Sequence, residues 1–154
     1  MKKILLSAAV IALTATAFAQ KKVDDIAKFT TETINLGKIK QGVPTKGVFT
    51  VANISNSAII IEQANPTCGC TISDYTKEPI AAGKTGVINA TYNAANVGHF
   101  DKHLTVKFAG IDEMKSITLT GDVVTAEEFD NMKPAEKPAA AALATPAKKA
   151  KSKK

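Results

Sequence analysis

The sequence predicts an all-β fold: an antiparallel β-sandwich of about seven strands, with a cleaved N-terminal signal and a disordered C-terminal tail. Three observations predict the sandwich. Residues 29–124 contain short β-type runs separated by Gly, Pro, Asn and Ser. They show no long helical period, and nothing among them resembles the crossover helix that a parallel sheet needs. Their length, about 96 residues, is close to that of an immunoglobulin-like (Ig-like) sandwich.

Six or seven strands are expected in this region. The runs that define them cover residues 29–36, 46–53, 59–63, 85–92, 100–108 and 117–123. Turn-forming residues separate them, as in Gly42-Val43-Pro44 and Ala82-Gly83-Lys84. Alternation gives the strands an inward apolar face, made by Phe49, Val51, Ile88, Ala90, Tyr92, Phe100, Leu104, Val106, Phe108, Ile117, Leu119 and Val123. A small closed barrel would show the same pattern and remains an alternative.

The N-terminus has the three-part layout of a secretory signal. Met1-Lys2-Lys3 precedes an apolar run over residues 4–13 and the small-x-small pattern Ala17-Phe18-Ala19. We expect cleavage before Gln20, so that residues 1–19 are a signal peptide and residues 20–28 a linker. The apolar run is well short of the roughly 20 residues that span a bilayer. The sequence therefore predicts export to the periplasm or the extracellular space, with no transmembrane span after cleavage.

The C-terminal segment 125–154 is expected to be a disordered tail, because from Lys133 onward it is almost wholly Pro, Ala and Lys. By count, residues 133–154 carry a net charge of +6, whereas residues 20–132 carry −2. The tail is either a solvated extension or an attachment to an anionic surface, such as phospholipid headgroups, lipopolysaccharide or an acidic polymer. The residues that would make this attachment are Lys148, Lys149, Lys151, Lys153 and Lys154.

Composition argues against several functions. The chain contains no Arg, and specific recognition of nucleic acid usually depends on the guanidinium group. It contains no Gly-rich phosphate loop and no recognisable nucleophile turn, so we predict neither a cofactor nor catalytic residues. These observations favour a protein that is not an enzyme.

Cys68-Gly69-Cys70 is the motif with the clearest chemical potential. An oxidising compartment favours a disulfide between the two cysteines, and Gly69 can bend the chain to bring the sulfurs together. The pair could then be structural, or redox-active if the bridge is easily reduced. As thiolates, Cys68 and Cys70 would instead be candidate ligands for a soft metal such as Cu(I) or Zn(II), although two cysteines cannot complete a four-ligand zinc site.

His99 and His103 are predicted to be exposed and without a metal. They alternate with the inward-facing residues of the strand at 100–108. At about 3.3 Å per residue the two side chains would be about 13 Å apart, too far to share one ion. No metal site is therefore predicted from the histidines.

An ordered series of short motifs resembles a known bacterial family, the one catalogued as domain of unknown function 1573. The motifs are Asn35-Leu36-Gly37-Lys38-Ile39, Gly42, Phe49-Thr50-Val51-Ala52-Asn53, Pro66-Thr67-Cys68-Gly69-Cys70-Thr71, Lys77-Glu78-Pro79-Ile80, Gly83 and Gly98-His99-Phe100. The Cys-Gly-Cys-Thr step is the hallmark of that family. The resemblance covers residues 29–124 and implies an exported Ig-like domain, akin to modules of major sperm protein and of ciliary and centrosomal proteins. It implies no established activity.

Two functions follow as hypotheses. The first is an exported, non-enzymatic Ig-like module that binds or organises other components of the cell envelope, with envelope proteins or anionic surface polymers as partners. The alternative is a thiol redox or soft-metal-handling protein that acts through Cys68-Gly69-Cys70.

Overall fold

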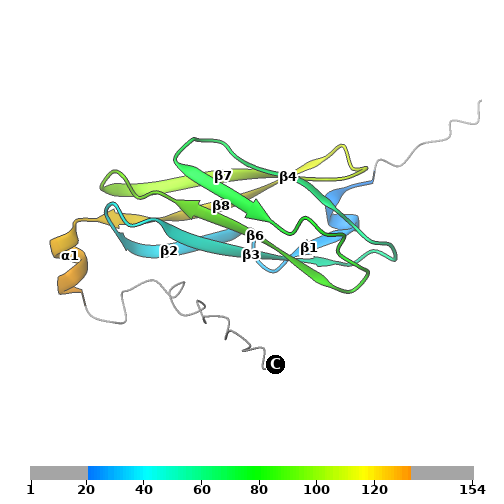
Figure 1. Ribbon diagram of the computed structural model, residues 1–154, viewed down its shortest axis with the longest axis horizontal. Coiled ribbons are helices and arrows are strands. Elements are labelled where there is room, and N and C mark those ends of the chain that lie inside the picture. The colour runs from blue at the N-terminus through cyan, green and yellow to red at the C-terminus, as the bar shows by residue number, and fades with distance from the viewer. Residues whose placement is uncertain (1–20, 133–154) are drawn as a thin grey trace, which may run out of the picture.

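A computed structural model of the protein describes residues 21–132, which form two four-stranded sheets packed face to face (Figure 1). The elements, in chain order, are the 3-10 helix η1 (Val23–Asp25), β1 (Ala27–Phe29), β2 (Thr33–Lys40), β3 (Thr45–Asn53), β4 (Ile61–Pro66), β5 (Thr71–Tyr75), β6 (Thr85–Tyr92), β7 (Gly98–Phe108), β8 (Met114–Val124) and the helix α1 (Ala126–Asn131). Residues 21–132 include no helix with the length and apolarity that a membrane crossing requires. The all-β sandwich is confirmed.

The strand order is β1-β3-β6-β5 in the first sheet, called sheet A below, and β2-β8-β7-β4 in the second, called sheet B. This order matches the ABED and CFG sheets of an immunoglobulin constant-type domain, with β2 added beside β8. The β2–β8 pair is parallel, which corrects the prediction of a purely antiparallel sandwich. Short connections constrain only strands that follow one another, whereas β2 and β8 lie far apart in the chain.

The core fills the space between the sheets. Every residue assigned to the inward face from the sequence is buried, and Phe49, Val106, Phe108, Ile117 and Leu119 are fully so. Aromatic pairs connect the two sheets: the Phe29 and Phe108 rings meet edge to face, with centroids 6.4 Å apart, and Tyr92 stacks on Phe100 at 4.2 Å. The alternation read from the sequence therefore identifies the packed surface correctly.

The first predicted strand is in fact two strands that belong to different sheets. β1 pairs with β3 in sheet A, and β2 pairs with β8 in sheet B. The chain bends between them, where the Thr31 hydroxyl donates to the Thr33 carbonyl at 2.6 Å. Such local side-chain hydrogen bonds favour a bend over a continuous strand.

The folded unit extends beyond both expected boundaries. In the segment assigned to a linker, Val23, Ile26 and Ala27 are buried in the core. At the other end α1 lies beside β2, where Lys38 pairs with Glu128 at 3.4 Å and Lys40 with Asp130 at 2.9 Å. The sandwich therefore begins before Phe29, and an ordered helix occupies the start of the predicted tail. The predicted signal (1–19) and the basic segment 133–154 lie outside the described residues.

Lys115 on β8 holds the N-terminal segment in place. Its Nζ is 2.7 Å from Glu32 Oε1 and 2.9 Å from Asp24 Oδ1. The hydrogen bonds to Glu32 and then to Asp24 raise the pKa of Lys115 by favouring its charged form. This contact ties η1 and the β1–β2 bend to sheet B.

Candidate functional site

The Cys68-Gly69-Cys70 loop joins β4 of sheet B to β5 of sheet A, so the chain changes sheets at this point. The two sulfurs form a disulfide, and the Cα atoms of the bridged residues are 5.4 Å apart. In this oxidised state neither sulfur is a thiolate ligand. No group of three or more metal-binding side chains gathers within residues 21–132.

Hydrogen bonds to main-chain carbonyls fix the loop at both ends. The Thr67 N–H and the Thr67 hydroxyl both donate to the His103 carbonyl, at 3.0 and 3.1 Å. The Asn93 N–H donates to the Cys70 carbonyl at 3.1 Å. Because none of these bonds involves sulfur, β7 and the β6–β7 connection hold the loop independently of the disulfide.

The two sulfurs have different surroundings. Both cysteines are half-buried, and Cys70 packs against the hydrophobic core. Cys68 Sγ lies 3.8 Å from the Oγ1 of Thr71, a residue with only 3% of its surface exposed. Lys77, the cation closest to the loop in sequence after it, instead covers the Tyr75 ring at 3.8 Å from the centroid. The Thr71 hydroxyl is therefore the polar group that contacts the disulfide.

A bridge across so short a loop stabilises the fold only weakly. Chain-entropy estimates for closing a three-residue loop give about 1.5 kcal/mol, against about 3 kcal/mol for fifteen residues. The sandwich has a large core of its own, and the hydrogen bonds at Thr67 and Asn93 already fix the loop. The disulfide therefore adds little to the free energy of unfolding of the domain.

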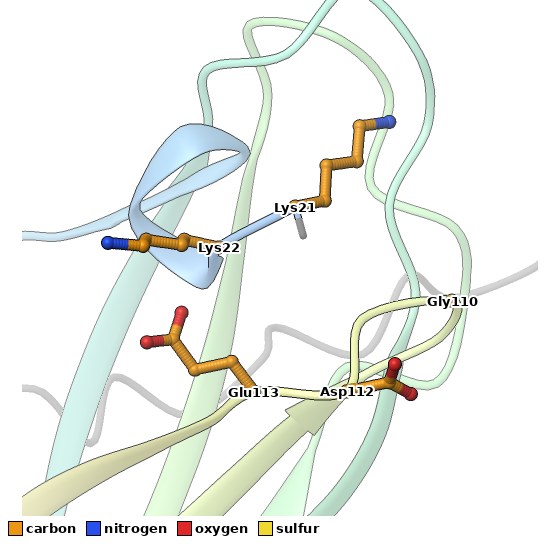
Figure 2. Close-up of a pocket in the computed structure, with 5 residues that line it drawn as sticks. All are labelled: Lys21, Lys22, Gly110, Asp112 and Glu113. Atoms are coloured by element: carbon orange, nitrogen blue, oxygen red, sulfur yellow. The ribbon is translucent and has the colours of Figure 1, made fainter. Parts of the chain in front are cut away.

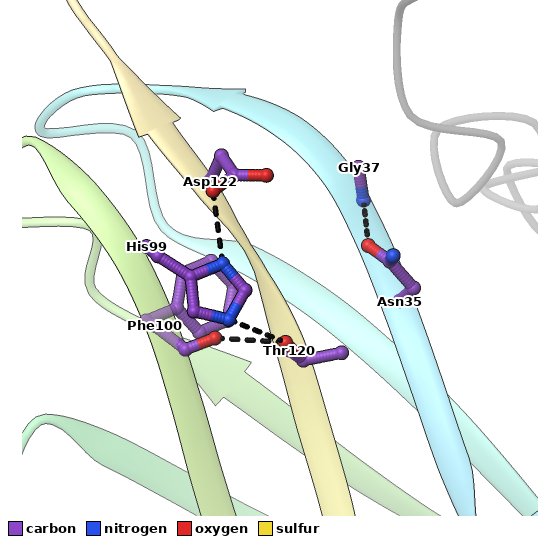
Figure 3. Close-up of polar contacts among 6 residues, drawn as sticks. All are labelled: Asn35, Gly37, His99, Phe100, Thr120 and Asp122. Carbon is purple, nitrogen blue, oxygen red and sulfur yellow. Dashed lines mark hydrogen bonds and ion pairs between the residues drawn. The ribbon is translucent and has the colours of Figure 1, made fainter.

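His99 and His103 lie on the solvent face of β7, as predicted. His99 Nδ1 is 2.9 Å from Asp122 Oδ1, and its Nε2 is 3.4 Å from Thr120 Oγ1 (Figure 3). This series resembles a hydroxyl–histidine–carboxylate relay. The Thr120 hydroxyl, however, donates to the Phe100 carbonyl at 2.9 Å, so its proton points away from the histidine. The arrangement is a cross-strand polar ladder and does not activate a nucleophile.

An open hollow of about 360 Å³ lies between the N-terminal segment and the β7–β8 turn, at the end of the sandwich opposite α1 (Figures 1 and 2). Its lining places Lys21 and Lys22 across from Asp112 and Glu113. The Val23 N–H donates to Glu113 Oε2 at 2.7 Å, so one carboxylate already serves to hold the N-terminal segment. The hollow offers no convergent set of reactive groups.

The two outer faces of the sandwich differ in charge. On sheet B, β7 and β8 present charged and titratable side chains: His99, Asp101, His103, Lys107 and Asp122. On sheet A, β6 contains no charged residue, and β3 contains only Lys46. Val48 and Val87 are exposed at the centre of this face. On β5, Ile72 is 73% exposed opposite Thr91, and the exposed Asp74 lies opposite Asn89. Asp74, Lys46 and Lys28 on β1 therefore border the uncharged centre. We call Val48, Val87, Ile72 and the neighbouring Thr50, Asn89 and Thr91 the uncharged face.

The edge of β4 is closed to another strand. The Ser73 hydroxyl donates to the Ala64 carbonyl, and the Tyr75 hydroxyl donates to the Glu62 carbonyl at 2.8 Å. Pro66 ends the strand and has no N–H to offer. Natural sheets use such devices to prevent edge-to-edge pairing. A partner is thereby directed to a sheet face or a loop rather than to this edge.

Sequence reasoning located the cysteine loop and the histidines but missed the uncharged face and β5. It named Thr71 as part of the Cys-Gly-Cys-Thr step and gave it no role of its own. The absence of charge over residues 85–92 was the available signal for the face. The candidate attachment residues Lys148, Lys149, Lys151, Lys153 and Lys154 lie outside the described residues.

A family model described as a protein of unknown function, DUF1573, matches residues 27–123. No curated protein matches the chain at a significant level. The match agrees closely with the region over which the short motifs resemble that family.

Solved structures share the fold at low sequence identity. A protein of unknown function from Porphyromonas gingivalis W83 has a TM-score of 0.55 and 9% identity, over 63% of this chain and 46% of that one. The ASH/PapD-like domain 7 of human CEP192 has a TM-score of 0.53 and 11% identity, over 65% and 86%. The VesB protease of Vibrio cholerae has a TM-score of 0.51 and 17% identity, over 64% and 32%. The chain thus spans about half of the first of these proteins, and the likeness shows the fold alone.

Proposed function

This chain belongs to the DUF1573 family, and we propose that it is an exported, non-enzymatic module that binds another protein of the cell envelope through the uncharged face. Protein interfaces are depleted of charge at their centres, and the two central strands of sheet A have this character. This contrast between the two faces is the observation that carries the proposal. The partner would present an uncharged surface rich in aliphatic side chains.

A charge placed at the centre of this face tests the proposal. The double variant Val48→Glu/Val87→Glu buries two carboxylates in the interface, so the protein is expected to run as a free monomer in native electrophoresis of mildly extracted envelopes. The matched control is Thr105→Glu/Ser116→Glu, an adjacent pair on the outer face of sheet B. It should keep the slower-migrating complex. The proposal fails if both double variants keep the complex, or if both lose it while remaining folded.

The predicted signal at residues 1–19 and the basic tail add a proposal about where the protein is located in the cell. Cleavage before Gln20 would release the module into the periplasm or outside the cell. Lys148, Lys149, Lys151, Lys153 and Lys154 would then hold it to an anionic surface polymer. The folded body carries a net charge of −2, so attraction to such a polymer would come from the tail.

Removing residues 148–154 tests the attachment. The shortened protein is expected to leave the envelope fraction at low salt, because five of the seven tail lysines are gone. Immunoblots of washed envelopes measure the distribution, and high salt should release the full-length protein in the same way. Unchanged partitioning of the shortened protein would rule out attachment by these lysines.

A thiol redox role at Cys68 and Cys70 is the second candidate function. The observation that favours it is the small stabilisation that a disulfide across three residues supplies, in a loop already fixed by hydrogen bonds. A bridge with little structural value can be opened and closed without loss of the fold. This role is compatible with partner binding on the uncharged face.

A further inference from the structure

The Thr71 hydroxyl is buried against the disulfide. Thr71 is 3% exposed, and the hydrogen-bond partner of its hydroxyl within residues 21–132 is Cys68 Sγ at 3.8 Å. A disulfide sulfur accepts a hydrogen bond weakly, whereas a thiolate accepts one strongly. The Thr71 hydroxyl thus makes only a weak hydrogen bond in the oxidised state. In the reduced state it is well placed to stabilise a Cys68 thiolate.

Cys70 lacks this contact and packs instead against the apolar core. Apolar surroundings disfavour a thiolate, so reduction makes the two sulfurs unequal. In the reduced loop we therefore expect Cys68 to be the thiolate and Cys70 the protonated thiol. Two cysteines separated by a single residue remain close enough for one to attack a bond formed by the other.

We propose that Cys68 is the sulfur that exchanges with a partner, that Cys70 is the resolving sulfur, and that Thr71 positions and stabilises the Cys68 thiolate. This inference rests on the second candidate function, the thiol redox role, and assigns a separate task in it to each of the three residues. The partner is a protein dithiol, of the class that passes electrons to disulfides in an oxidising compartment.

The reaction balances as a two-electron exchange. A partner thiolate attacks Cys68 Sγ; a bond forms between these two sulfurs, and the Cys68–Cys70 bond breaks. Cys70 leaves with the electron pair and takes a proton from water. The second partner thiolate then attacks the first partner sulfur, which closes the partner's disulfide and releases the Cys68 thiolate to the Thr71 hydroxyl. The reverse sequence oxidises the module.

The fold permits this cycle because the hydrogen bonds that fix the loop do not involve the sulfurs. The Thr67 and Asn93 hydrogen bonds remain when the S–S bond opens, and β4 and β5 keep their own pairing with β7 and β6. Reduction therefore changes the chemistry of the loop without releasing it.

Glutathione is the probe that tests both the redox role and the assignment. With the full mature chain, the disulfide is expected to equilibrate with mixtures of reduced and oxidised glutathione, as read by alkylation and mass spectrometry. A bridge that stays oxidised in all such mixtures overturns the redox role itself, and the assignment with it.

Single-cysteine variants test the assignment separately. With oxidised glutathione at pH 7, Cys70→Ser should form a mixed disulfide at Cys68 about ten times faster than Cys68→Ser forms one at Cys70. Equal rates, or a faster Cys70, would overturn the assignment even where wild-type exchange is normal. Circular dichroism confirms that each variant keeps its sheets.

Variants of Thr71 test the positioning role. Added to Cys70→Ser, Thr71→Val should slow mixed-disulfide formation several-fold and move the pH dependence of Cys68 alkylation upward, whereas Thr71→Ser should restore both. Thr67→Val is the matched control, because the Thr67 hydroxyl bonds to the His103 carbonyl and not to sulfur, and the Thr67 N–H keeps its own bond to that carbonyl and so still fixes the loop. It should leave both readouts unchanged. A Thr71→Val protein that reacts like its parent, or a Thr67→Val protein that slows equally, would contradict the role.

Discussion

Replacing Asn53 with Ala is expected to lower the free energy of unfolding by about 3 kcal/mol, because four hydrogen bonds depend on this one side chain. Asn53 is 1% exposed. Its Nδ2 donates to the Ser57 and Ile80 carbonyls at 2.7 and 2.8 Å. Its Oδ1 accepts from the Ser55 N–H at 2.9 Å and from the Ser55 hydroxyl at 2.8 Å. Removing the amide leaves the buried Ile80 carbonyl without this donor.

Urea denaturation of the purified residue 20–132 domain measures the effect, as a lower midpoint with an unchanged slope. Asn56→Ala is the control, since Asn56 is an exposed residue of the same turn. It should change stability by less than about 0.5 kcal/mol. If Asn53→Ala costs less than about 1 kcal/mol, the network does not hold the β3–β4 turn against the segment before β6.

Replacing Gly121 with Val is expected to lower the melting temperature by about 10 °C or more. An added Cβ at this buried position on β8 would lie 2.7 Å from the Gly37 carbonyl oxygen and 2.9 Å from the Phe100 ring. Neither neighbour can easily move, because Gly37 belongs to the strand paired with β8, and Phe100 stacks on Tyr92. Overpacking of this kind costs about 3 kcal/mol, which corresponds to a shift of this size in a domain of about 100 residues.

Thermal denaturation followed by circular dichroism measures the shift. The control is Ser116→Val, a substitution at an exposed position of the same strand. It should leave the melting temperature nearly unchanged, because Val suits a strand and the position is exposed. A Gly121→Val protein that melts with the wild type would show that β2 and β8 are not packed as tightly as described.

Most of the fold could be predicted from periodicity. The long strands β3, β6, β7 and β8 bury one face each, and their alternation is visible in the sequence. β5 escaped because it is a five-residue edge strand with Ile72 on its exposed side. The parallel pairing of β2 with β8 escaped because pairing between distant strands leaves no local pattern.

One missed element did carry a signal. The sequence Thr125-x-x-Glu128 has the form of a capping box, and the Thr125 hydroxyl accepts from the Glu128 N–H at 3.2 Å at the start of α1. This helix was not predicted, because the segment from residue 125 onward was assigned as a whole to the disordered tail on the basis of its Lys-rich C-terminal part.

The candidate site could be predicted only in part. The cysteine spacing left a bridge, free thiols and a metal site open, because sequence separation does not fix the distance between two sulfurs. The contact between Thr71 and Cys68 depends on the turn that the bridged loop makes. The uncharged face depends on which strands become neighbours, and only the pairing of β3 with β6 brings Val48 and Val87 together.

Photo-crosslinking in the native envelope is the most direct test of the central claim. That claim is that the module works by binding a protein through the uncharged face. A photo-crosslinking amino acid in place of Val48 is expected to give one discrete protein adduct, and the same group in place of Ser116 on sheet B to give none. Adding Val87→Glu should abolish the adduct from position 48. A discrete adduct from position 116 and none from position 48 would contradict the account.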